Sequence, residues 1–198
     1  MREDDDKKGG GLSLLYSYDC EWEINEVNIN NPDLRCVRIE TKHMTIIVMA
    51  TYASVLNTAN DKKRNQVLMN DLENLLKNFN DNKIILIGDF NGHIKEIGKQ
   101  NENYNGKIMK NVASRHILKY KNLFEKCKGQ TTWKRGDMSS TIDYALANEH
   151  MFNNFIDMII DEENNIFDSS DYNLIEIKIK IIATREAANK EEHIEFFS

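Results

Sequence analysis

The chain has 198 residues, of which 40% are hydrophobic and 29% are charged, and its formal net charge is −6. This length suits one domain with a sizeable core, and the acidic balance excludes a protein that binds nucleic acid through its overall charge. The three cysteines have no paired spacing, which excludes a disulfide framework; no stretch is long and apolar enough to span a membrane, and the charged amino terminus does not resemble a signal peptide. We therefore expect an intracellular protein, nuclear or cytoplasmic and not secreted.

The first part of the chain is predicted to contain a charged head and three strands. Residues 1–8 are mostly Asp and Lys and are expected to form a disordered head, and the glycines at 9–11 begin the domain. Residues 12–18 are apolar and aromatic enough for a strand. Residues 36–40 and 44–51 form a hairpin by pattern, and the second of these strands is apolar on both faces, as is typical of a central strand.

The second part is predicted to alternate helices with short strands. Apolar residues at helical spacing predict an amphipathic helix over residues 61–79, and a second helix, carrying basic residues, is expected at about residues 107–125. Short strands are predicted at 83–88, 131–133, 140–147, 155–161 and 174–182. The domain is therefore expected to cover residues 9–182, followed by a polar tail at 183–198.

The rest of the chain is organised around the stretch at residues 83–92. Its four consecutive branched aliphatic residues are typical of a buried strand, and Gly88, Asp89 and Asn91 follow them. If the backbone stays extended, the side chains of Asp89 and Asn91 leave the same face of the strand and point into one pocket. The alternative is a strand followed by an ordinary Asp/Asn/Gly turn.

Basic residues are concentrated between residues 107 and 135, where Glu125 is the single acid. The segment contains Lys107, Lys110, Arg115, Lys119, Lys121, Lys126, Lys128, Lys134 and Arg135. It is a candidate surface for contacting phosphates. A solvated helix face in a chain rich in Lys and Asn explains it equally well.

Three later fragments extend the motif at Asp89 and Asn91. They are Thr-Thr-Trp at 131–133, Ser-Thr-Ile-Asp-Tyr at 140–144, and Ser-Asp-Tyr-Asn-Leu-Ile at 170–175. With the loop at Tyr52 and the Gly-Asp-Phe-Asn motif at 88–91, their order and spacing resemble the endonuclease/exonuclease/phosphatase superfamily. The resemblance is greatest to the AP-like endonuclease domains of non-LTR retrotransposons, and it runs from about residue 10 to residue 182.

The resemblance implies an α+β fold, a four-layer α/β/β/α sandwich of the DNase I type, and Mg²⁺-dependent cleavage of phosphodiesters in DNA. By this resemblance, Asp89 orients or activates the attacking water, Asn91 holds that water or a phosphate oxygen, and Tyr52 contacts the phosphate. Asp171 serves the metal or a neighbouring ligand, and Asp143 orients a catalytic histidine. Trp133 matches an aromatic residue near the DNA-binding rim, although a buried packing role explains a lone Trp equally well.

The chain departs from the family pattern at the catalytic histidine. The family's Ser-Asp-His motif is Ser-Asp-Tyr at 170–172. Tyr172 is no substitute, because a phenol titrates near pH 10 and donates a hydrogen bond without supplying an imidazolium. Asp143 is therefore expected to lose its partner.

The second departure concerns the amino end. In the family, a strand bearing an asparagine, a helix and a strand ending in a metal-binding glutamate precede the glycine run. None of these elements lies before Gly9, so the domain is expected to lack them, together with the principal Mg²⁺ carboxylate. An alternative is that Met1 is a misplaced start.

These features lead to three functional hypotheses. The first is a retrotransposon-type endonuclease domain, degenerate and with little or no activity, that uses Mg²⁺ if any activity remains. The second is a non-catalytic nucleic-acid-binding module that contacts the DNA backbone through the residues Lys119, Lys121, Lys126, Lys128, Trp133 and Arg135. The third is a phosphatase or a lipid phosphodiesterase of the same superfamily.

Overall fold

The computed structural model describes residues 12–13, 15, 17, 20–98, 100–163, 170–181 and 194–195. The predicted head at 1–8 lies outside these residues, as does the predicted tail at 183–198 apart from residues 194–195. None of the helices in the described part of the chain is long and apolar enough to cross a membrane.

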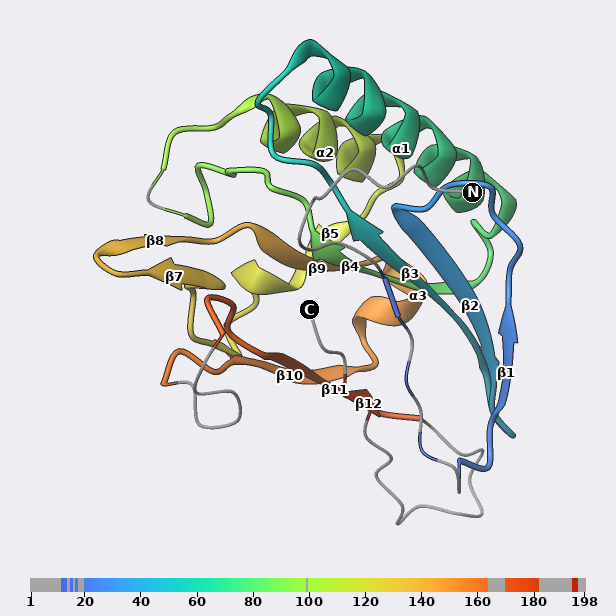
Figure 1. Cartoon of the computed structure of the whole chain (residues 1–198). Helices are drawn as coiled ribbons and strands as arrows, with labels where there is room; N and C mark the ends of the chain where they lie inside the picture. Colours follow the sequence, from blue (N-terminus) through green and yellow to red (C-terminus); the bar gives the residue numbers. More distant parts are fainter. Residues whose placement is uncertain are drawn as a thin grey trace.

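The main sheet has six strands in the order β1-β2-β3-β4-β9-β5 (Figure 1). Strand β3 runs antiparallel to β2 and parallel to β4, and β4 runs antiparallel to β9. The strands are β1 Glu23–Glu26, β2 Leu34–Glu40, β3 Thr45–Tyr52, β4 Lys83–Asp89, β9 Asp143–Ala147 and β5 Lys119–Tyr120. The predicted hairpin at 36–51 and the predicted strand at 83–88 are therefore confirmed.

A second sheet has the strand order β12-β11-β10-β6, and β7 and β8 form a separate hairpin. Strands β10 and β11 are antiparallel, whereas β6 runs parallel to β10. The bounds are β6 Cys127–Lys128, β7 Trp133–Arg135, β8 Met138–Ser140, β10 Phe155–Ile160, β11 Ile175–Ile179 and β12 Ile194–Glu195. The second sheet lies on the opposite side of the main sheet from the long helices (Figure 1).

Two long helices cover the outer face of the main sheet (Figure 1). Helix α1, Ala59–Asn78, begins at a capping box between Thr58 and Asp61, which satisfies backbone N–H groups that the first turn leaves without partners. Helix α2, Tyr104–Arg115, is capped by the side chain of Asn103. The short helices are η1, Lys121–Leu123, and α3, Glu149–Phe152.

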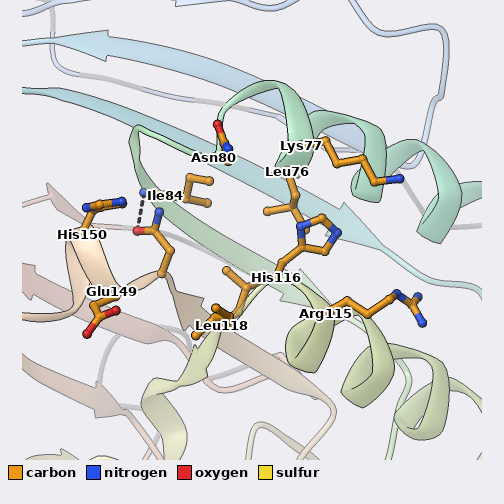
Figure 2. Close-up of a pocket in the computed structure, with 11 residues that line it drawn as sticks. Leu76, Lys77, Asn80, Ile84, Arg115, His116, Leu118, Glu149 and His150 are labelled. Carbon is orange, nitrogen blue, oxygen red and sulfur yellow. Dashed lines mark hydrogen bonds between the residues drawn. The ribbon is translucent and has the colours of Figure 1, made fainter.

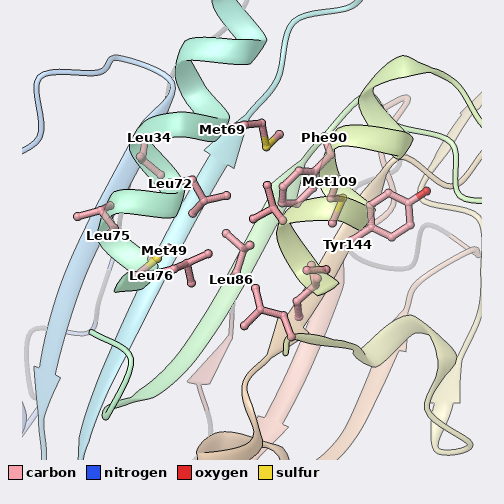
Figure 3. Packing of buried hydrophobic residues seen from close by; sticks show 14 of the residues in the cluster. Leu34, Met49, Met69, Leu72, Leu75, Leu76, Leu86, Phe90, Met109 and Tyr144 are labelled. Carbon is pink, nitrogen blue, oxygen red and sulfur yellow. The ribbon is translucent and has the colours of Figure 1, made fainter. Parts of the chain in front are cut away.

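Alternating side chains of the central strands build two cores. On β3, Ile47 and Met49 belong to the core beneath the helices, whereas Ile46 and Val48 belong to the core between the two sheets. Figure 3 shows Met49 and Leu86 below the leucines of α1. Strand β3 is therefore a central strand, as its two apolar faces predict, and the α+β sandwich is confirmed.

The second helix is shorter than predicted. It ends at Arg115, because Ile117 adopts the left-handed conformation, with φ of 53°, and Leu118 turns into the core. The predicted helix over 107–125 is therefore wrong beyond Arg115, and β5 and η1 occupy the rest of that segment. The strand predicted at 12–18 falls partly outside the described residues, and those described within it form no strand; the first strand in the described residues is β1.

Gly88 allows β3 and β4 to pair closely. It lies within β4 with φ of 143°, and a Cβ atom there would come within 2.0 Å of the Thr51 carbonyl oxygen on β3. Such a contact with backbone cannot be relieved by rotating a side chain. The glycine therefore does not end the strand; it lets the strand continue alongside β3 as far as Asp89.

Candidate active site

Three neighbouring strands bring Tyr52, Asp89 and Asp143 to one level of the main sheet. Tyr52 on β3 is the cross-strand partner of Asp89 on β4, and Asp89 is the cross-strand partner of Asp143 on β9. Directly opposed residues extend from the same face of a sheet and lie close together. The pairing thus assembles residues that are 91 positions apart in the sequence, Tyr52 and Asp143.

Asp89 and Asn91 are held together by a tight turn. The Asn91 backbone N–H donates to Asp89 Oδ1 at 2.7 Å, and its side-chain Nδ2 donates to Asp89 Oδ2 at 3.0 Å and to the Ala53 carbonyl at 2.8 Å. Asn91 has φ of 44°, in the left-handed region that Asn tolerates. The backbone therefore forms the turn given as the alternative and is not extended, but the carboxylate and the carboxamide do lie together.

Asp143 is a buried carboxyl group without a well-formed hydrogen bond in the described part of the chain. Its side chain is fully buried, and neither carboxylate oxygen has a hydrogen bond of normal geometry there, although the Thr132 hydroxyl lies close enough to lower the pKa of the group. Its backbone N–H, like that of Ile142, donates to the buried Thr132 hydroxyl. That Asp143 lacks its usual partner stays a prediction.

Burial raises the pKa of both carboxyl groups above the ordinary value for aspartate. Burial and the charge of nearby Asp89 together raise the pKa of Asp143 to about 8, because a second negative charge opposes ionisation, while a hydrogen bond from the Thr132 hydroxyl opposes this shift. Burial also raises the pKa of Asp89 to about 6, although the hydrogen bonds from Asn91 and Tyr172 oppose this shift. The two groups titrate as a pair that retains a proton near neutral pH.

Tyr172 approaches Asp89 and not Asp143. Its hydroxyl donates to Asp89 Oδ2 at 3.5 Å, the long limit of a hydrogen bond, and a β-bridge to Trp133 fixes its backbone. Burial and the charge of Asp89 raise the pKa of this phenol above its ordinary value. Tyr172 is consequently a neutral hydrogen-bond donor at physiological pH.

Asp171 lies at the edge of this arrangement. Its side chain is 50% exposed and its Oδ2 is 3.9 Å from Nε of Arg135, while its backbone carbonyl accepts a hydrogen bond from Lys134 on β7. Across the described ranges, no group of three or more His, Cys, Asp or Glu side chains is arranged to hold a metal ion. Asp171 therefore lies next to Tyr172, but its carboxylate does not join the pair formed by Asp89 and Asp143.

The sequence analysis missed two buried asparagines behind the site. Asn65 on α1 and Asn105 on α2 are both fully buried and hydrogen-bond each other at 3.0 Å. A sequence signal existed for Asn65, which precedes Leu68 by three positions and Leu72 by seven and therefore lies on the apolar stripe of α1. The same signal existed for Asn105, which precedes Met109 by four positions and Val112 by seven on the buried face of α2.

The predicted DNA-contacting residues separate into exposed and buried groups. Lys119, Lys126, Lys128 and Arg135 are exposed, and Trp133 is half-buried. Lys121 is fully buried, with its ammonium 3.1 Å from the Phe152 carbonyl oxygen and 3.2 Å from the centre of the Phe152 ring. Burial lowers the Lys121 pKa to about 8.

The assignment of Lys121 to a DNA-contacting surface is therefore wrong. Its ammonium also lies within 4.5 Å of the ring centres of Phe124 and Phe155, so cation–π contacts take the place of water. A side chain with no exposed area cannot reach a phosphate.

A cavity of about 460 Å³ lies at the opposite end of β4 from the carboxylates. Figure 2 shows Lys77 and Arg115 on the helix side of this cavity and Glu149 and His150 on the other, around Leu76, Ile84 and Leu118. None of the predicted site residues lines it. The candidate active site is therefore the cluster at the carboxyl end of β4 and not this cavity.

The substitution Asp143→Asn is expected to stabilise the protein at alkaline pH. A raised pKa means that the folded state binds the Asp143 proton more tightly than the unfolded state, so stability falls as pH rises from the ordinary value of 3.8 through about 8. Near pH 9, the free energy of unfolding of the variant should exceed that of the unmodified chain by at least about 1 kcal/mol. This difference should shrink toward pH 4. Urea denaturation across this range measures it.

Asp137→Asn, a change in the exposed turn between β7 and β8, is the matched control and should show no such pH-dependent gain. Equal stabilisation by Asp143→Asn at every pH would contradict a buried ionisation penalty.

Similar folds occur in many solved structures, three of which serve as examples. The endonuclease domain of TRAS1, a telomere-specific non-LTR retrotransposon, has a TM-score of 0.66 and 16% identity over 83% of this chain and 70% of that one. An endonuclease/exonuclease/phosphatase family protein from Leptotrichia buccalis has a TM-score of 0.52 and 20% identity over 74% and 53%. The 3′ phosphatase NExo from Neisseria, bound to a product DNA hairpin, has a TM-score of 0.56 and 13% identity over 80% and 79%.

Sequence comparison gives the family. No curated protein matches the chain. The family model described as endonuclease-reverse transcriptase matches residues 46–175, which include β3, β4, β9 and the Ser-Asp-Tyr segment. The chain therefore belongs to the endonuclease-reverse transcriptase family, within the endonuclease/exonuclease/phosphatase superfamily.

Proposed function

We propose that this chain is a DNA endonuclease domain of the retrotransposon type whose catalytic site is degenerate and retains little or no activity. The observation that carries the proposal is the fully buried carboxyl group of Asp143 beside Asp89, which has no well-formed hydrogen bond among the described residues. A carboxylate at this level of the sheet is useful for orienting a histidine, and the chain has Tyr172 where the family has that histidine.

The remaining site residues retain part of the machinery for phosphodiester hydrolysis. Asp89 is the group that accepts a hydrogen bond or a proton from the attacking water, and its pKa near 6 leaves it largely ionised at pH 7. The Nδ2 atom of Asn91 donates to Asp89 and to Ala53. Its Oδ1 is an acceptor, so Asn91 is better suited to hold the water than a phosphate oxygen.

Tyr172 does not restore the missing step. Stabilising the negative charge that develops on the phosphoryl oxygens needs a positively charged or strongly donating group. The phenol of Tyr172 is neutral, and its hydroxyl is directed at Asp89. Loss of a general acid or base typically lowers the rate by roughly a hundred-fold to ten-thousand-fold.

Mg²⁺ is proposed as the cofactor of any residual activity, with Asp171 as the candidate ligand. Hard oxygen ligands suit Mg²⁺, which usually retains several waters and binds one or two carboxylates. However, Asp171 is half-exposed and its carboxylate lies 3.9 Å from the guanidinium of Arg135. The donor groups among the described residues do not fit a metal site by themselves, so no step of the reaction is assigned to the ion.

The direct test is nicking of supercoiled plasmid by the purified protein with Mg²⁺. The unmodified chain should nick slowly or not at all, and Tyr172→His should increase nicking because an imidazole then lies beside the carboxylate pair. Adding Asp89→Ala to Tyr172→His should abolish the gain. Robust nicking by the unmodified chain, removed by Asp89→Ala alone, would contradict the claim of degeneracy.

A second candidate function is nucleic-acid binding without cleavage. The observation in its favour is the row of exposed cations on the segment from β5 to β7, Lys119, Lys126, Lys128, Lys134 and Arg135, where Glu125 is the only acid. Backbone phosphates attract such a row even when the net charge of the protein is negative.

Reversing the charge of Lys126 and Lys128 together to Glu should weaken binding to double-stranded DNA and reduce its salt dependence, as measured by fluorescence anisotropy. Lys77→Glu, in the last turn of α1, is the control and should reduce DNA affinity less. Lys121→Met should lower thermal stability and leave DNA affinity unchanged. Unchanged affinity after the double reversal would remove this candidate.

A further inference from the structure

A buried carboxamide links the two loops that end β3 and β4. Asn105 Nδ2 lies 3.2 Å from the Ser54 carbonyl oxygen, 3.1 Å from that of Phe90 and 3.3 Å from that of Asn91. These three acceptors share the two hydrogens of one NH₂ group. Asn105 therefore contacts the backbone just after Tyr52 and the backbone just after Asp89.

The orientation of the Asn105 carboxamide is itself fixed. Its Oδ1 accepts a hydrogen bond from Nδ2 of Asn65 at 3.0 Å. Asn65 in turn forms a pair of hydrogen bonds with Ser54. Its Nδ2 donates to the Ser54 carbonyl oxygen at 2.7 Å, and its Oδ1 accepts from the Ser54 backbone N–H at 2.8 Å. The two asparagines thus anchor the Ser54 backbone to both long helices.

Two neighbours strengthen the attachment of α2 to the turn at Asn91. The Asn103 side chain donates to the Asn91 carbonyl at 3.0 Å and accepts from the His93 N–H at 2.9 Å. Gly106 lies so close to this loop that a Cβ atom there would come within 2.0 Å of the His93 carbonyl oxygen. The start of α2 is therefore packed directly against the backbone that follows the Gly-Asp-Phe-Asn motif.

This arrangement controls the geometry of the carboxylate site. The Ala53 carbonyl holds the Asn91 side chain, and the Ala53 N–H donates to the Asp89 carbonyl at 2.8 Å. A relative movement of the two loops would change both contacts and turn the Asn91 carboxamide away from Asp89. Burial makes the asparagine bonds costly to break, because the freed carbonyls would have no water to replace the lost donor.

We propose that Asn105 is the positioning residue of this site, whose buried carboxamide locks the Ala53–Ser54 and Phe90–Asn91 backbones together and so sets the orientation of Asn91 against Asp89. The assignment of Asp89 and Asn91 as site residues rests on the proposed function. The locking itself does not, because it is a property of the folded chain whether or not the chain cleaves DNA.

The test compares Asn105→Ala with Asn148→Ala by NMR of the full chain. Asn148 is a matched control: it is also buried and accepts from Ile84 and Met151 at 3.1 Å, but it lies at the opposite end of β4. Asn105→Ala should shift the side-chain amide signals of Asn91. It should also speed amide exchange at Ala53 and Asn91 by at least about tenfold relative to amides of β10 and β11.

Asn148→Ala should leave the Asn91 signals and their exchange unchanged while lowering the melting temperature to a similar extent. If Asn105→Ala does not fold, Asn105→Leu provides the second variant, since it keeps the approximate shape of the buried side chain and removes the donor. Native Asn91 signals in a folded Asn105 variant, or equal changes in the Asn148 control, would overturn the proposal. Plasmid nicking is not measured in this test. Absence of the Asn91 changes would therefore refute the positioning role alone, whereas only the nicking experiment can refute the proposed function.

Discussion

The site depends on the close pairing of β3 with β4 at Gly88. Because residue 88 has no Cβ, the Thr51 carbonyl can approach the β4 backbone, and the ladder continues to Tyr52 and Asp89. The same strand pairs with β9 on its other edge and brings Asp143 to the level of Asp89. The two strand pairings alone therefore place Tyr52, Asp89 and Asp143 on one face of the sheet, without any contribution from the loops.

The electrostatic state of the site follows from that placement. Two carboxyl groups on adjacent strands cannot both ionise easily in a buried environment, and their raised pKa values express this. Asp89 has donors in Asn91 and Tyr172, whereas neither carboxylate oxygen of Asp143 has a well-formed hydrogen bond in the part of the chain that the structure describes. The buried asparagines hydrogen-bond the backbone near Asp89 and so connect this part of the site to the two long helices.

Much of the fold follows from local pattern. The aliphatic run before Gly88 predicts a central strand, and the spacing of Leu68, Leu72 and Leu75 predicts α1, because burial on one or two faces imposes these periods. The site residues Asp89 and Asp143 were recognised from motifs, but their register as direct partners depends on tertiary pairing. Local pattern also gave no means of predicting the end of α2, since Ile117 adopts a conformation that β-branched residues disfavour.

Long-range packing explains what the sequence did not reveal. Lys121 looks like any other lysine of a basic segment, and its burial comes from Phe152 and Phe155, which lie some thirty residues later on α3 and β10. Asn105 likewise has its role only because two distant loops meet at its side chain. We propose that Asp143 has lost its histidine partner, and NMR titration of its side-chain carboxyl carbon tests this central claim most directly. We predict a midpoint far above the ordinary 3.8, near 8, that falls in Tyr172→His; a midpoint close to 3.8 in the unmodified chain would contradict the account.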